Sequence, residues 1–191
     1  MILSDREIKS RIKSKNIIIE PFNENHVQPA SYDLHLDNEF RVFKPHEAEI
    51  IDTKKPVHGA MQEVNLKNDE YFVLHPGSFA LGLIKEKTGV DSKHVGRLEG
   101  KSSLARLGLL IHTTAGFLDP GNCLKLTLEL YNASPLPIKL YPNMKIAQIA
   151  FEELSSECER PYGSPGLGSK YYKAEKIQES EMYKNFSDES S

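Results

Sequence analysis

Polar and charged side chains gather in one stretch of the chain, from Gly100 to Glu129, among residues that are otherwise largely apolar. At its start two hydroxyls, Ser102 and Ser103, lie between two cations, Lys101 and Arg106. Hydroxyls, backbone amides and cations so close together can hold phosphate oxygens, although this is not the spacing of a Walker loop. A solvated turn is the alternative for this segment taken alone. Because buried polar groups are costly unless they are paired, the density of polar residues favours a functional site.

Two carboxylates, Asp119 and Glu129, follow within the same stretch. Leucines alternate with polar residues from position 124 to 130, so one face of the predicted strand carries Lys125, Thr127 and Glu129 together. An enclosed glutamate near Arg106 can act as a general base, whereas an isolated one is usually a surface carboxylate. Asp119 stands before a Pro-Gly turn, where aspartate commonly bonds its own backbone. Alternation alone leaves open whether this face meets solvent, another subunit or a ligand.

The sequence lacks the ligand pattern of a zinc deaminase. None of the seven histidines begins a His-x-Glu sequence, and Cys123 and Cys158 cannot form Pro-Cys-x-x-Cys. Hydrolytic chemistry at the candidate site is therefore expected to activate water with no zinc and no metal held by protein side chains. The two distant cysteines suit reduced thiols, so we expect no disulfide and a cytoplasmic protein.

The composition predicts one soluble domain. The 191 residues are 39% apolar and 27% charged, with a formal net charge of -3. This balance excludes the strongly basic field that a polynucleotide partner needs, and it is compatible with a small anionic ligand. No apolar run reaches membrane-spanning length and the start carries no secretory signal, so we expect no membrane partner.

Short β-type runs dominate the predicted secondary structure. Ser4 and Glu7 form a capping-box pattern ahead of Ile8 and Ile12, which predicts one helix over about residues 5–14. Many short strands at the observed spacing are typical of a mostly-β barrel or sandwich. We expect a single domain over residues 1–174 and a charged, flexible tail over residues 175–191. Strands are predicted over residues 17–19, 32–36, 39–43, 71–74, 79–84, 109–113, 124–131, 138–141 and 145–151.

Several motifs, in order along the chain, carry a resemblance to a known family. They are Met-Ile-Leu-Ser-Asp-Arg (1–6), Gln-Pro-Ala-Ser-Tyr-Asp-Leu (28–34), Gly-Lys-Ser-Ser-Leu-Ala-Arg (100–106), His-Thr-Thr-Ala-Gly-Phe-Leu-Asp-Pro-Gly (112–121), Leu-Thr-Leu-Glu (126–129), Lys-Ile-Ala-Gln-Ile-Ala-Phe (145–151), Pro-Tyr-Gly (161–163) and Ser-Lys-Tyr (169–171). Together they resemble the dCTP deaminase family of the dUTPase-like superfamily. The resemblance implies a mostly-β, distorted barrel or jelly roll with a short N-terminal helix. It also implies a homotrimer with sites at the subunit interfaces.

The same resemblance implies catalytic roles for five residues. Glu129 would accept a proton from the water that attacks C4 of cytosine, and then deliver protons to the ring and to the departing ammonia. Ser102 and the backbone of Ala115 would hold that water, and Arg106 would pair with Glu129 and keep it ionised. Asp119 would contact the deoxyribose and, in a two-step enzyme, help to position the water that attacks phosphorus.

Nucleotide contacts are implied along most of the same motifs. The segment from Lys101 to Arg106 would hold phosphates, and Tyr162 and Lys170 would close over the triphosphate and a magnesium ion bound through it. The expected ligands are dCTP and dUTP, with dTTP as a candidate feedback inhibitor. The implied nucleotide-binding residues are Lys101, Ser102, Ser103, Leu104, Ala105, Arg106, Asp119, Thr127, Leu128, Glu129, Gln148, Tyr162 and Lys170.

Ala115 and Gly116, together with Gln148, resemble the branch of the family that converts dCTP through dUTP to dUMP and pyrophosphate. Strictly deaminating members tend to carry a bulkier residue after the alanine. We therefore expect a dUMP-forming dCTP deaminase. Three alternatives stay open: a deaminase that releases dUTP, a dUTPase without deaminase activity, and a non-catalytic nucleotide-binding regulator.

Three positions depart from the family pattern. Ala174 replaces a glutamine, Asn122 replaces an aromatic residue, and Lys101 replaces an arginine. Gln178 or another tail residue is a candidate substitute for the missing glutamine. A lysine offers a point charge rather than a bidentate fork, so these departures affect the expected affinity more than the chemistry.

Overall fold

One short helix opens the chain, and strands follow it. The computed structural model describes residues 1–44, 50–57, 59–67 and 69–190. Helix α1 (Asp5–Lys13) confirms the helix expected over about residues 5–14, and it packs through the fully buried Ile8. The side chain of Ser4 makes no capping hydrogen bond, so the predicted capping box is not formed. Asp5 and Glu7 still place negative charge at the helix N-terminus, where the helix dipole favours it.

Strands make up most of the other elements. Their bounds are β1 (Ile17–Glu20), β2 (Val27–Gln28), β3 (Ser31–Phe43), β4 (Met61–Asn65), β5 (Phe72–Leu74), β6 (Phe79–Val90), β7 (His94–Gly100), β8 (Leu109–Leu110), β9 (Phe117–Leu118), β10 (Cys123–Asn132), β11 (Ile138–Leu140) and β12 (Lys145–Glu153). Besides α1, the helical elements among the described residues are α2 (Ser102–Ala105) and two 3₁₀ segments, η1 (Glu24–His26) and η2 (Met182–Ser190).

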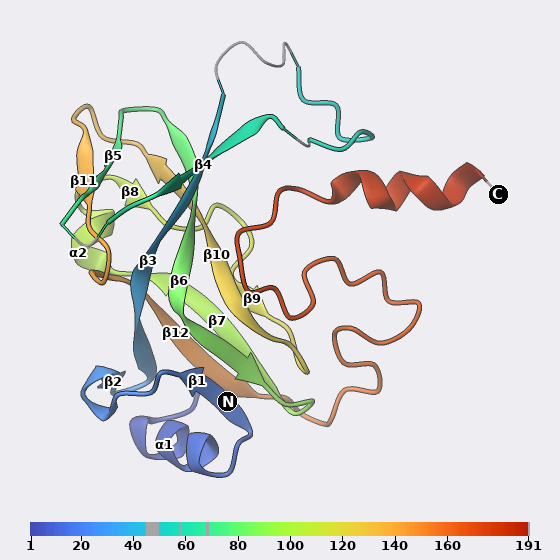
Figure 1. Cartoon of the computed structure of the whole chain (residues 1–191). Helices are drawn as coiled ribbons and strands as arrows, with labels where there is room; N and C mark the ends of the chain where they lie inside the picture. The colour runs from blue at the N-terminus through green and yellow to red at the C-terminus, as the bar shows by residue number, and fades with distance from the viewer. Residues whose placement is uncertain (45–49, 58, 68, 191) are drawn as a thin grey trace.

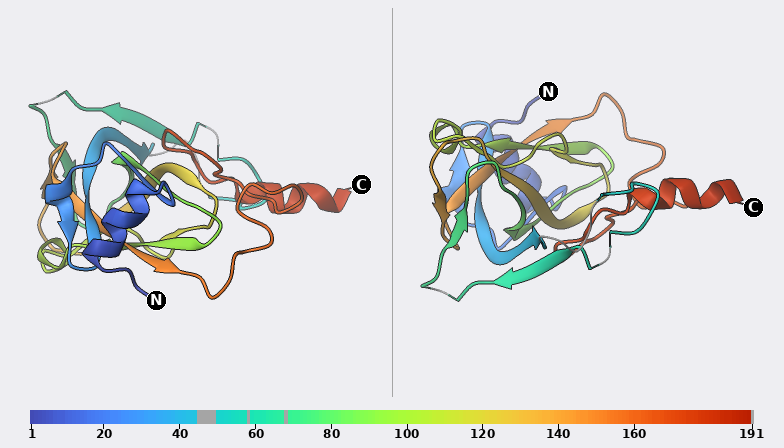
Figure 2. Two further views of the ribbon diagram at one scale, coloured as in Figure 1. Left: turned by 90° about the horizontal axis from the view of Figure 1, so that it is seen from below. Right: turned by 90° about the horizontal axis from the view of Figure 1, so that it is seen from above.

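The strands form one large antiparallel sheet and one small one. The large sheet runs in the order β8-β10-β6-β3-β12-β7-β9, with β1 beside β6 and with β2 and β4 beside β3; β5 and β11 pair separately. Figures 1 and 2 show the large sheet curling around itself so that its strands enclose the core. This architecture confirms the predicted mostly-β, barrel-like fold with a short N-terminal helix.

Strand β3 joins two expected runs, residues 32–36 and 39–43, into one strand. Its first half pairs with β12 and its second half with β4, and its register with β6 shifts between Leu36 and Phe40. A bulge of this kind lets a strand bend and change partners without ending. Strands β4 and β7 are not among the predicted ones, because polar and charged side chains interrupt their apolar pattern.

Strand β10 shows the alternation expected from its sequence. The four leucines between positions 124 and 130 are each at most 9% exposed, and they join a core that contains Tyr32, Phe40 and Phe151. Lys125, Thr127 and Glu129 lie on the other face and are partly exposed. The strand therefore anchors its polar residues through the leucines behind them.

The C-terminal segment lies against the large sheet. Ala174 and Ile177 are 7% and 2% exposed, the Lys125 N–H donates to the Ala174 carbonyl at 2.8 Å, and the Ile177 N–H donates to Glu39 Oε1 at 3.2 Å. Part of the segment 175–191, which we expected to be a flexible tail, is thus packed in this conformation. Its flexibility stays a prediction.

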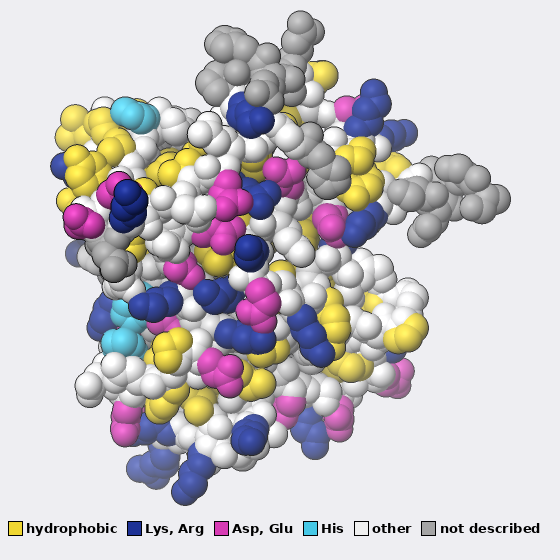
Figure 3. All heavy atoms as spheres, viewed as in Figure 1, with side chains coloured by type: hydrophobic (Ala, Val, Ile, Leu, Met, Phe, Trp, Pro, Cys, Tyr) yellow, Lys and Arg dark blue, Asp and Glu magenta, His cyan; other side chains and the backbone are white. Residues whose placement is uncertain are grey.

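No helix in the described ranges is long and apolar enough to span a membrane. Figure 3 shows lysine and arginine side chains interspersed with aspartate and glutamate side chains over the face that it displays.

Candidate active site

A cavity of about 680 Å³ opens beside the polar face of β10. Its walls come from β10, from the loop that connects β8 to β9, from residues 51–57 and from the C-terminal segment. Five of the predicted site residues line it, namely Ala115, Asp119, Thr127, Glu129 and Tyr162. Residues far apart in sequence therefore meet at one hollow, as expected of a ligand site.

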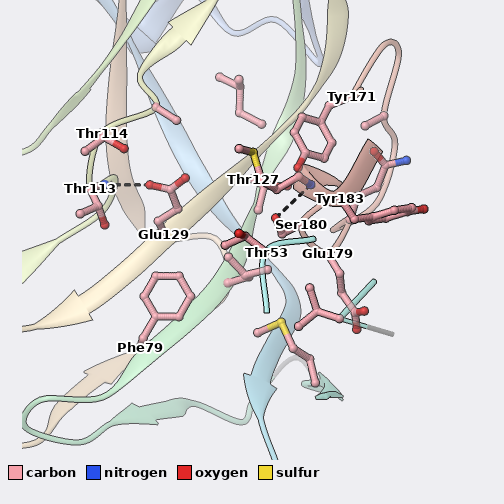
Figure 4. A pocket seen from close by; sticks show the side chains of 18 of the residues that line it. Thr53, Phe79, Thr113, Thr114, Thr127, Glu129, Tyr171, Glu179, Ser180 and Tyr183 are labelled. Carbon is pink, nitrogen blue, oxygen red and sulfur yellow. Dashed lines mark hydrogen bonds between the residues drawn. The ribbon is translucent and has the colours of Figure 1, made fainter. Parts of the chain in front are cut away.

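Glu129 is held at one wall of this cavity. Its backbone N–H donates to the Ile111 carbonyl at 3.0 Å, and its Oε2 atom accepts a hydrogen bond from the Thr113 N–H at 2.9 Å. Figure 4 shows the carboxylate pointing toward Thr113 and away from Tyr171 on the opposite side. Its Oε1 atom has no hydrogen bond to any residue that the structure describes. One oxygen is thus fixed, and the other is available to a ligand or to water.

Asp119 lies in the turn before β10 and lines the same cavity. The turn is closed by the Asn122 N–H, which donates to the Asp119 carbonyl at 3.1 Å. Burial raises the pKa of the Asp119 carboxyl above its ordinary value of 3.8. Asp119 therefore adds a second predicted carboxylate, besides Glu129, to the walls of the cavity.

The segment predicted to bind phosphate lies outside the walls of this cavity. Ser102 to Ala105 form α2 and Arg106 caps its C-terminus, with the side chains of Ser102, Ser103 and Arg106 exposed. In Figures 1 and 2, α2 lies at the side of the molecule opposite the C-terminal segment. Arg106 forms no ion pair with any described residue, so the pairing of Arg106 with Glu129 implied by the resemblance is not made within one chain. The reason is geometric. Helix α2 lies beside the edge strand β8, outside the cavity, whereas the Glu129 carboxylate points into the cavity.

Lys101 does meet a charged partner, at the buried carboxylate of Asp33. Lys101 Nζ lies 2.5 Å from Asp33 Oδ1 and Lys145 Nζ lies 2.9 Å from Asp33 Oδ2, while the Asp33 side chain is 3% exposed. Burial acts to raise the pKa of Asp33, but the hydrogen bonds and charges of the two lysines outweigh it and hold that pKa below 3.8. Asp33 therefore stays ionised and fixes both cations.

Gln148 lies beside this cluster of Asp33, Lys101 and Lys145. In the β12–β3 ladder Gln148 is the partner of Asp33; its Oε1 atom accepts from Ser31 Oγ at 2.9 Å, and its amide nitrogen donates to the Gly100 carbonyl at 3.3 Å. Neither Asp33 nor Lys145 is among the predicted site residues. Both stand within motifs quoted for the resemblance, at 28–34 and 145–151, so the signal to single them out was present in the sequence.

The C-terminal segment supplies a wall that the sequence predicted only in part. Tyr162 lines the cavity as expected, whereas Lys170 and the buried Leu128 do not. The position of the missing glutamine, Ala174, is packed in the core, and Gln178, its suggested substitute, lines the cavity. Further lining residues outside the prediction include Asp52, Thr53, Lys55, Val57, Tyr171, Glu179, Ser180, Met182 and Tyr183.

Asn122, another departure from the family pattern, has a structural role here. The residue is 4% exposed, and its Oδ1 atom accepts hydrogen bonds from the Cys123 N–H at 2.9 Å and from the Lys173 N–H at 3.1 Å. The residue thereby ties the turn at Asp119 to the C-terminal segment. An aromatic side chain at this position could not accept these bonds.

Comparison with known proteins decides the family. A family model described as dCTP deaminase-like matches residues 2–154. The chain belongs to this family. Relatives named "dCTP deaminase, dUMP-forming" from Corynebacterium jeikeium and Corynebacterium kroppenstedtii are 49% and 50% identical over 186 residues, which is 97% of this chain and 99% and 100% of theirs.

A solved structure supports the dCTP deaminase-like fold. The 2'-deoxycytidine 5'-triphosphate deaminase of Agrobacterium tumefaciens superposes with a TM-score of 0.61 at 21% identity, covering 78% of this chain and 46% of that one. At this identity the likeness concerns the fold alone. The resemblance read from the motifs is thus confirmed for the family and for the fold, while the roles of individual residues stay predictions.

Proposed function

We propose that this protein is a dCTP deaminase that also forms dUMP in the same site. In the first step dCTP and water give dUTP and ammonia, and in the second dUTP and water give dUMP and pyrophosphate. The observation that carries the proposal is the Glu129 carboxylate, fixed by the Thr113 N–H at one oxygen and available at the other, in a cavity that also holds Asp119. The names and full-length similarity of the relatives support the same reaction.

Glu129 is the proposed general base and acid of the deamination. It takes a proton from water as the oxygen attacks C4 of cytosine, and it returns protons to the ring nitrogen and to the leaving ammonia. Ser102 and the backbone of Ala115 are proposed to hold the water, because a nucleophile without metal activation must be aligned with its base. Asp119 is proposed to contact the sugar and to help place the second water, near phosphorus.

The complete site is proposed to form between copies of the chain in a homotrimer. Ser102 and Arg106 lie outside the cavity of their own chain, so a neighbouring copy has to supply them to Glu129. Exposed apolar side chains surround the α2 segment, with Leu107, Leu110 and Leu136 exposed by 58%, 40% and 70%. A group of this kind is a suitable contact surface for a second copy.

Magnesium is proposed to enter with the triphosphate. Asp33 is the buried carboxylate nearest to the predicted phosphate segment, and both of its oxygens already contact lysines. The residues present therefore fit a site in which Lys101 and Gln148 contact phosphate oxygens, while the ion is held by the nucleotide rather than by a protein carboxylate. Tyr162 and Lys170 are the proposed closing residues, dTTP is a proposed feedback inhibitor, and the proposed location is the cytoplasm.

One product analysis tests the proposal. Purified protein is incubated with dCTP and magnesium, and ammonia, dUTP, dUMP and pyrophosphate are resolved over time. We expect ammonia and pyrophosphate in equal amounts, with dUMP as the final nucleotide. Free dUTP as the only nucleotide product would indicate a deaminase-only enzyme. Hydrolysis of added dUTP with no turnover of dCTP would indicate a dUTPase. Nucleotide binding with neither product would indicate a regulator.

A further inference from the structure

A second pocket, away from the Glu129 cavity, brings together side chains that commonly bind metals. His26 from η1, His35 from β3 and Glu86 from β6 each offer one ligand atom there, and these atoms all lie within 4.8 Å of one another. None of the three lines the Glu129 cavity. We propose that His26, His35 and Glu86 form a binding site for a divalent transition-metal ion of the zinc type, separate from the reaction centre.

Glu86 is buried and fixes His35 at two points. Its side chain is 4% exposed; Oε2 accepts the backbone N–H of His35 at 2.9 Å, and Oε1 lies 2.6 Å from the ring Nδ1. A carboxylate bonded to one ring nitrogen orients the imidazole and raises the basicity of its other nitrogen, as in many zinc sites. Both Glu86 oxygens thus contact His35, so in the proposed site Nε2 of His35 and a ring nitrogen of His26 bind the ion, while Glu86 orients His35 and supplies the compensating charge.

His26 faces His35 across the same pocket, with the two ring centroids 4.4 Å apart. Two cations oppose a metal ion here. Lys85 lines the pocket and donates from Nζ to Asn143 Oδ1, and Lys145 acts on His26 from outside it. The charge of Lys145 is offset, because its Nζ lies 2.9 Å from Asp33 Oδ2.

The donor set selects the type of ion. Imidazole nitrogens favour Zn²⁺ and related transition metals, whereas Mg²⁺ and Ca²⁺ favour oxygen ligands. Asn143 and Glu24 also line the pocket, so its rim carries polar groups that water on the ion could contact. Figure 3 shows histidine side chains at the left edge of the molecule, on the side where β2 lies in Figure 1. The site is therefore accessible from solvent.

Metal titration of the full-length protein tests the site without reference to dCTP turnover. Metal-free protein is titrated with Zn²⁺ in a calorimeter and with Co²⁺ in an absorbance spectrometer. We expect one ion per chain and Co²⁺ spectra typical of nitrogen and oxygen ligands. We also expect the unfolding temperature to rise with Zn²⁺, because a ligand that binds only the folded state stabilises it.

Two variants test the site, and a third is the control. His26→Asn is expected to abolish the saturable binding, and Glu86→Gln, which keeps the shape and an acceptor oxygen, to weaken it by about 10- to 100-fold. His75→Asn is the matched control, because His75 is exposed on the turn between β5 and β6 and lines neither pocket. Circular dichroism of each variant verifies the fold.

Several results would overturn the site. Absence of saturable Zn²⁺ binding in the wild-type protein, or binding that survives His26→Asn, excludes it. An intense thiolate band with Co²⁺ assigns the ion to a cysteine instead. If the Zn²⁺ affinity of Glu86→Gln equals that of the wild-type protein, Glu86 is not part of the site and the three-residue assignment is wrong.

Discussion

At the scale of single residues, Glu129 combines a fixed position with a carboxylate oxygen, Oε1, that accepts no hydrogen bond from the described part of the chain. The Thr113 N–H holds Oε2 at 2.9 Å, so the carboxylate is oriented before any ligand arrives. A side chain oriented in this way loses little entropy when it meets a reacting water molecule. These features make Glu129 the residue on which the proposed chemistry depends.

Replacing Glu129 by glutamine tests that role. Glutamine keeps an oxygen that can accept from Thr113 but cannot take a proton, so we expect ammonia release from dCTP to fall by about 10²- to 10⁴-fold. Nucleotide binding, measured by calorimetry, is expected to change little. Glu99→Gln, on the exposed side of β7, is the control and should keep wild-type turnover. Wild-type rates in Glu129→Gln would remove Glu129 from the reaction.

The ion pairs of Asp33 predict an acid-sensitive contribution to stability. The pKa of Asp33 is lower in the folded protein than in the unfolded chain, where it is about 3.8. The ionised carboxylate therefore stabilises the fold at pH values above about 3.8, and this contribution is lost as the pH falls through the lower pKa of the folded protein. Asp33→Asn is expected to lower the free energy of unfolding by about 1–2 kcal/mol at neutral pH, since the lysines are partly screened by solvent.

Urea unfolding at a series of pH values measures this effect. The difference between wild type and Asp33→Asn should be largest at neutral pH and shrink below pH 3.8. The exposed Asp69 provides a control substitution, Asp69→Asn, which should show no such trend. A difference that stays constant with pH would mean that Asp33 acts by packing and not by charge.

At the scale of elements, the loop between β8 and β9 couples the fold to the site. It carries Thr113 and Ala115, and the Leu98 N–H donates to the Gly116 carbonyl at 2.7 Å, which ties the loop to β7. A Cβ atom on Gly116 would lie 3.1 Å from the Leu98 carbonyl oxygen and 3.5 Å from Cε1 of His112. Little room exists here for a side chain.

Enlarging Gly116 should therefore move the loop and change the product ratio. We expect Gly116→Val to shift the Ala115 backbone and to reduce pyrophosphate formation more than ammonia release, so that dUTP accumulates. Gly116→Ala should show a smaller shift in the same direction, since it adds a single carbon atom. Chromatography of the nucleotides after incubation with dCTP gives the ratio. An equal loss of ammonia and pyrophosphate would indicate that Gly116 does not affect the two reaction steps differently.

At the scale of the whole molecule, the proposed site requires more than one copy of the chain. Glu129 lines the cavity, while Ser102 and Arg106 lie outside it and are exposed. Two inactive variants with defects on different sides of a shared site should therefore complement each other in mixed oligomers. A site built within one chain would not allow this.

Mixing Arg106→Ala with Glu129→Gln chains tests the shared site. After joint unfolding and refolding at equal amounts, about one quarter of the sites in random oligomers should combine an intact Arg106 with an intact Glu129. Ammonia release should rise well above that of either variant alone. Mixing Ser102→Ala with Arg106→Ala is the control, because both defects lie on the same side and no activity should return. No recovery in the first mixture would contradict an intersubunit site.

The sequence by itself determined the local properties of this protein. The helix over Asp5–Lys13 and the inward leucines of β10 follow from side-chain periodicity, which depends only on neighbouring residues. The face that Glu129 shares with Thr127 follows in the same way. The ordered motifs additionally indicated the family, because they span nearly the whole chain.

Only the tertiary structure decided which distant residues meet. The ion pairs of Lys101 and Lys145 with Asp33 depend on how β3, β12 and β7 pair, and the walls formed by residues 51–57 and by the C-terminal segment depend on how the sheet curls. The separation of Arg106 from Glu129 has the same origin. Pairing and curvature are set by the free energy of the whole fold, so they leave no local pattern in the residues that they bring together.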